Sequence, residues 1–191
     1  MQQTLTSPHL TIWDALLVSS ATYAKSITAQ LTPAQLGQRP SWGGWSVAEV
    51  FEHLCITDGL YAKPLHALFA AERSRTAPRQ SPAWSPTLFG RMLLWSLNPS
   101  NARKNPAPAA FKPGAVRDHV VETWLEQVET TRSLMREADG FDLRKLKLSS
   151  PAAKLIRLNA GDAFALCAVH AQRHMGQVAR TIADITGGAR A

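Results

Sequence analysis

The chain has 191 residues, 45% of them hydrophobic and 18% charged, a composition typical of one soluble globular domain that we expect to cover residues 1–191. The longest apolar run, residues 88–97, is interrupted by Arg91 and is too short to span a bilayer, and the N-terminal residues lack the pattern of a secretory signal. The formal net charge is +7, but the basic residues gather mostly in connecting segments without a DNA- or RNA-binding motif, so we expect a solvated basic surface and no nucleic-acid partner.

The first predicted helix covers residues 8 to about 30. Ser7 is the expected N-cap, and Pro8 suits the first helical position, where its missing N–H costs nothing. Apolar residues then recur at three- and four-residue steps, which indicates an amphipathic helix. Residues 34–44 follow as a turn-rich connector containing Pro40.

The second predicted helix begins after Trp45 and continues to about residue 73. Ser46 and Glu49 have the spacing of a capping box, and Trp45 and Val50 have the spacing of a hydrophobic staple. Pro64 lies inside this span, so a kink is expected there. Residues 76–113 are rich in proline and predict a long connection to the next helix, with one short helix at 87–97.

Two further long helices are predicted at residues 116–138 and 160–185. The third ends at Asp139-Gly140, and a basic connector at 141–158 contains at most a helical turn near 152–158. No alternating strand pattern is evident. The predicted fold is therefore all-α, a four-helix bundle with a long Pro-rich connection between its second and third helices.

Two histidines on the last predicted helix suggest a metal site. His170 and His174 are four residues apart, so they project from the same helix face, and that face is apolar. A third ligand is expected on the inner side of another helix, and His53 is the best candidate. The competing interpretation is a set of hydrogen-bonded core histidines. The candidates for a fourth ligand are water, Cys167 and a glutamate such as Glu49.

The same residues carry a family resemblance. The segment GGWSVAEVFEHL and the later segment NAGDAFALCAVHAQRHMGQV resemble the DinB-like (YfiT-like) metal-dependent proteins, most closely the DinB_2 group. The resemblance implies a bundle of the DinB/YfiT-like type, and it implies that His53, His170 and His174 bind a divalent metal, commonly zinc or nickel. It also implies a homodimer.

The resemblance gives two hypotheses for function. Related proteins include S-transferases that use low-molecular-weight thiols such as bacillithiol or mycothiol, and a thiol-dependent maleylpyruvate isomerase. The leading hypothesis is a cytoplasmic, metal-dependent S-transferase that joins such a thiol to a small electrophilic substrate, with the cosubstrate rather than Cys167 as the nucleophile. The alternative is a non-catalytic bundle, with a structural metal or none, acting as a protein- or ligand-binding stress-response module.

Overall fold

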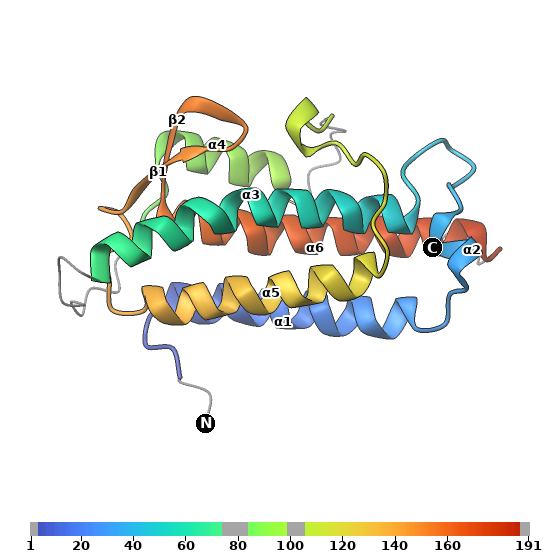
Figure 1. Cartoon of the computed structure of the whole chain (residues 1–191), viewed down its shortest axis with the longest axis horizontal. Coiled ribbons are helices and arrows are strands. Elements are labelled where there is room, and N and C mark those ends of the chain that lie inside the picture. Colours follow the sequence, from blue (N-terminus) through green and yellow to red (C-terminus); the bar gives the residue numbers. More distant parts are fainter. Residues whose placement is uncertain (1–3, 74–83, 99–105, 188–191) are drawn as a thin grey trace.

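The computed structural model describes residues 4–73, 84–98 and 106–187. This part of the chain is mainly helical, with one two-stranded antiparallel sheet (Figure 1). In chain order the elements are α1 (Pro8–Thr28), α2 (Pro33–Gly37), α3 (Val47–Arg73), α4 (Leu88–Leu97), the 3-10 helix η1 (Ala109–Phe111), α5 (Val120–Ala138), β1 (Lys147–Ser150), β2 (Ala153–Asn159) and α6 (Ala160–Ile185).

The four longest helices lie side by side. Helix α3 packs against α5 and α6, and α1 packs against the same two helices. Their apolar faces meet in one continuous core, where the largest fully buried side chains include Trp124, Phe51, Phe69 and Phe164. Helix α4 lies on α6 and also contacts β2. Among the described residues, no helix combines the length and the apolar character needed to cross a bilayer.

The predicted capping box of α3 is confirmed. The Ser46 amide donates to Glu49 Oε2 (2.8 Å), and the Glu49 amide donates to Ser46 Oγ (3.1 Å). These bonds satisfy two amides that the first turn of a helix leaves without partners. Ser7 precedes α1 as predicted, but its side chain makes no capping hydrogen bond. The local sequence therefore determines the residue at which α3 begins, and with it the position of each side chain along the helix axis.

The prediction that the fold contains no strands, with a helical turn near 152–158, is wrong. Strands β1 and β2 pair there as a hairpin, with Leu148 opposite Leu158. Both leucines are buried, whereas Lys154, Leu155 and Arg157 on β2 are exposed. The hairpin's alternation is short, so it gives little signal in a basic stretch, and its pairing is stabilised by burial against the helices.

Two further elements differ from the predicted ones. Helix α5 begins at Val120 rather than Val116, because the Arg117 amide donates to Glu52 Oε2 (3.2 Å) and His119 adopts a left-handed backbone with φ of 50°. Residues 33–37 form α2 within the expected connector, capped by a box between Thr32 and Gln35. Both departures depend on particular polar contacts rather than on apolar periodicity.

The predicted short helix at 87–97 is present as α4, with Thr87 as its N-cap. Thr87 Oγ1 also donates to Asp162 Oδ2 on α6 (2.8 Å), which ties α4 to the start of the last helix. Gly90 allows this approach, since a Cβ there would lie 2.4 Å from the Asp162 carboxyl carbon. Much of the remaining Pro-rich stretch, residues 74–83 and 99–105, lies outside the described residues.

One acidic side chain, Asp58, is buried in the core. Its Oδ2 accepts a hydrogen bond from Trp124 Nε1 (3.0 Å), while its Oδ1 has no partner among the described residues. Burial raises the pKa of the Asp58 carboxyl from 3.8 to about 7, although the Trp124 bond acts in the opposite direction. The folded protein therefore favours a protonated Asp58 in mildly acidic solution.

We expect Asp58→Asn to remove a component of the pH dependence of stability. A folded-state pKa above the unfolded value means that Asp58 contributes stability below about pH 4 that is lost as the pH rises through about 7. The difference in unfolding free energy between wild type and Asp58→Asn should therefore shift by about 2–4 kcal/mol, in favour of the variant, between pH 4 and pH 8. Urea denaturation across this range measures it, and parallel pH profiles would contradict a protonated Asp58.

Candidate metal centre

His170 and His174 are positioned by the long helix α6. Its first turn is fixed by a capping box, in which the Asp162 amide donates to Asn159 Oδ1 (2.8 Å) and the Asn159 amide donates to Asp162 Oδ2 (3.1 Å). Four residues correspond to about one turn, so the two imidazoles lie one above the other on the same face. Both side chains are buried, as the apolar stripe predicts.

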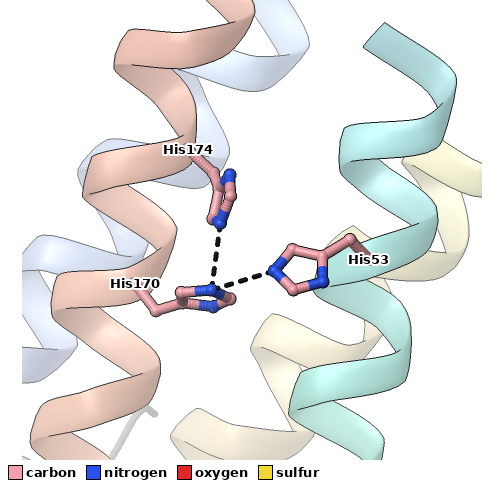
Figure 2. Close-up of side chains that lie close together, drawn as sticks. All are labelled: His53, His170 and His174. Atoms are coloured by element: carbon pink, nitrogen blue, oxygen red, sulfur yellow. Dashed lines mark hydrogen bonds between the residues drawn. The ribbon is translucent and has the colours of Figure 1, made fainter. Parts of the chain in front are cut away.

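His53 reaches the same point from α3. Its Nε2 lies 3.1 Å from His170 Nε2, and His174 Nε2 lies 2.9 Å from that same atom. Figure 2 shows the three rings pointing toward one another between the two helices. One nitrogen of each histidine falls within 4.8 Å of the other two, and among the described residues these three form the group that could hold a metal ion.

The outward-facing nitrogens of two histidines have hydrogen-bond acceptors. His53 Nδ1 donates to the backbone carbonyl of Phe111 in η1, and His174 Nδ1 donates to Gln177 Oε1 (2.9 Å). Because a neutral imidazole carries one proton, these bonds place the proton on Nδ1 and leave Nε2 with a free lone pair. Outer acceptors of this kind orient histidines that ligate metals.

Three neutral imidazoles that converge in this way have too few protons to pair all of their facing nitrogens. His170 can donate its Nε2 proton to only one of the two lone pairs, and its buried Nδ1 has no partner among the described residues. If the proton sits on Nδ1 instead, three lone pairs face one another. A cation resolves both cases, and a four-coordinate zinc ion with Zn–N bonds of about 2.0–2.1 Å separates its ligand nitrogens by roughly 3.3 Å. The separations of 2.9 and 3.1 Å from His170 Nε2 to the other two Nε2 atoms are close to this value, and the three ligand nitrogens all lie within 4.8 Å of one another.

Burial keeps the three imidazoles neutral. Desolvation lowers the pKa of His174 to about 3 and holds the pKa of His170 well below its ordinary value. Desolvation also lowers the pKa of His53, opposed by the bond to the Phe111 carbonyl. A neutral imidazole is the form that binds metal, so metal and proton compete little here at neutral pH.

The other candidate ligands lie elsewhere. Cys167 is buried outside the histidine group, and desolvation raises its thiol pKa well above the ordinary value, which makes it a poor thiolate donor. Glu49 pairs with Arg39 and caps α3. The acids of the third predicted helix, Glu122, Glu126 and Glu129, are exposed.

The three other histidines lie outside the group. The His9 ring stacks against Trp13, with ring centroids 5.9 Å apart, and His66 and His119 are exposed.

The contacts around His53 were not predicted from the sequence. Glu52 is buried beside it and accepts from Arg117 Nε (2.8 Å) and Nη2 (2.7 Å), which fastens the segment after η1 against α3. Trp45 lies against the histidine itself, with ring centroids 4.9 Å apart. The one available signal was an acid on the inner side of α3, and its partner is 65 residues away in the sequence.

Comparisons with known proteins identify one family. The family model described as the DinB superfamily matches residues 17–178, a span that contains all three histidines. No curated protein and no solved structure matches the chain.

Proposed function

Because the chain belongs to the DinB superfamily, we propose that it is a divalent-metal-binding protein whose ion is held by His53, His170 and His174. The observation that carries this proposal is the convergence of three Nε2 atoms, two of them already oriented by acceptors on their outer nitrogens. Three neutral imidazoles suit zinc or nickel better than magnesium or calcium, which prefer oxygen ligands.

We also propose that residues 1–191 form one domain, a four-helix bundle of the DinB/YfiT-like type. The mutual packing of α1, α3, α5 and α6 supports it, as does a metal group built from facing side chains of α3 and α6. The cysteines of the described chain are free and buried, which is consistent with a reducing, cytoplasmic compartment.

The proposed activity is transfer of a low-molecular-weight thiol to a small electrophile. When bound, a divalent metal with an open coordination position lowers the pKa of a thiol and holds the thiolate ready to attack. The three histidines bind the ion, while the Phe111 carbonyl and Gln177 keep two of them oriented. Burial raises the pKa of Cys55 to about 12 and also raises the pKa of Cys167 well above its ordinary value, so we propose that the nucleophile comes from the cosubstrate.

One observation favours a second candidate, a structural metal in a non-catalytic binding module. None of the three histidines is more than 8% exposed, whereas a catalytic metal needs a route for its substrate. In this version the ion would cross-link α3 and α6, and the protein would act through contacts with protein or ligand partners.

The two candidates are separated by measuring metal and activity on the same preparation. After reconstitution with zinc or nickel, elemental analysis should give one ion per chain, and the protein should melt at a higher temperature than its metal-free form. At free metal 100-fold above the dissociation constant, the stabilisation should be about 2.7 kcal/mol. A preparation that binds no metal would rule out both metal-binding candidates.

Thiol conjugation is then assayed with bacillithiol, mycothiol and glutathione against a panel of electrophiles. Turnover that requires the metal would support the transferase. A metal-loaded, fully folded protein that is silent with every thiol would favour the structural metal. Size-exclusion chromatography with light scattering tests the proposed homodimer on the same sample.

A further inference from the structure

Helix α4 has a second apolar face that points away from the core. Its residues Leu93, Leu94 and Leu97 pack toward the rest of the protein, whereas Leu88, Phe89 and Met92 are exposed. Leu88 and Met92 are one turn apart, and Phe89 lies three residues before Met92, so these side chains share one side of the helix. Leu88 is 76% exposed. An ordinary surface helix would place polar residues there.

The β1–β2 hairpin extends this surface. Strand β2 contacts α4, and both elements lie on the same side of the long helices (Figure 1). At the hairpin, Leu155 is 94% exposed and is flanked in sequence by the exposed Lys154 and, two residues on, Arg157. We call Leu88, Phe89, Arg91, Met92, Lys154, Leu155 and Arg157 the α4–hairpin face.

The charges of this face all have one sign. Neither α4 nor residues 147–159 contain an aspartate or a glutamate, while Arg91, Lys154 and Arg157 are exposed. The nearby Asp162 is fully buried behind Gly90 and is bound by Thr87. In the sequence no acidic residue occurs between Glu72 and Asp118. Any occupant of the face must therefore offer negative charge together with apolar contact.

We propose that the α4–hairpin face docks peripherally on an anionic lipid surface. Leucine, phenylalanine and methionine side chains enter the boundary between headgroups and acyl chains, while arginine and lysine pair with the anionic headgroups. A second copy of the chain is a poorer occupant, since a twofold interface would place this cationic face against itself. Nucleic acid offers charge but no hydrocarbon region to cover Leu88 and Leu155.

Co-sedimentation of the full chain with vesicles tests the proposal. Vesicles of mixed phosphatidylglycerol and phosphatidylcholine should bind the protein at least about tenfold more strongly than vesicles of phosphatidylcholine alone, and high salt should weaken the binding. The double variant Leu88→Ser/Leu155→Ser and the charge-reversed variant Arg91→Glu/Lys154→Glu should each lose at least about tenfold in partitioning. Thermal melting checks that both variants fold. If the Leu88→Ser/Leu155→Ser variant does not fold, the charge-reversed variant alone decides the test.

Matched controls lie on α1. Ile12 is 56% exposed and Lys25 is exposed, so Ile12→Ser and Lys25→Glu change the same residue types away from the face and should bind vesicles like wild type. Equal binding to neutral and anionic vesicles, or none to either, would overturn the proposal. Self-association without lipid that Leu88→Ser abolishes would overturn it in favour of a second copy. Retained vesicle binding by both face variants would also overturn it.

Discussion

Replacing His170 by alanine is expected to lower the affinity for zinc by roughly a thousandfold, about 4 kcal/mol of binding free energy. His170 Nε2 is the central atom of the group, within 3.1 Å of the Nε2 atoms of both His53 and His174. Its loss leaves two ligands on different helices, which is too few for a structural or a catalytic site. Competition titration against a chromophoric chelator measures the affinity.

His66→Ala is the matched control, because His66 is an exposed histidine on α3 and should bind zinc like wild type. A graded comparison comes from Gln177→Ala, which keeps all three ligands but removes the acceptor that orients His174. That variant should lose only about 10- to 100-fold in affinity. If His170→Ala is folded and binds zinc as tightly as wild type, the histidine group is not the metal site.

Asp162→Ala is expected to lower the free energy of unfolding by about 3–5 kcal/mol, because one buried and two part-buried donors lose their acceptor together. The carboxyl accepts from the Asn159 amide (3.1 Å), from Thr87 Oγ1 (2.8 Å) and from the Thr87 amide (3.3 Å). These bonds cap α6 and attach α4 to it at the same point. Asp162 is fully buried, so water cannot replace them without opening the structure.

Urea denaturation followed by circular dichroism measures the loss. Gln35→Ala is the matched control: it removes the same position of the α2 capping box, but there the Thr32 and Gln35 contacts are exposed. That variant should cost less than about 1 kcal/mol. A loss below about 1 kcal/mol for Asp162→Ala would contradict the role of this carboxyl as a buried anchor.

Helix positions followed closely from the sequence wherever the signal was local. The Ser46–Glu49 capping box marks the start of α3, and apolar periodicity predicted the ends of α1, α3 and α6 to within two residues. The late start of α5 was missed because it depends on a distant partner, and the hairpin was missed because its alternation is short and its pairing depends on burial against the helices. Arg117 meets Glu52 only after α3 and α5 have packed, and Leu148 meets Leu158 only when the hairpin closes over the helices.

The sequence by itself determined which residues could form the candidate centre. Spacing put His170 and His174 on one apolar helix face, and the amphipathic pattern put His53 at the edge of the apolar stripe of another helix. Only the tertiary structure decided that three Nε2 atoms meet, that Phe111 and Gln177 hold two outer nitrogens, and that Cys167 and the glutamates stay apart. Helical periodicity fixes the direction of a side chain around its own axis, whereas the distance between two helices depends on how all their packed side chains fit together.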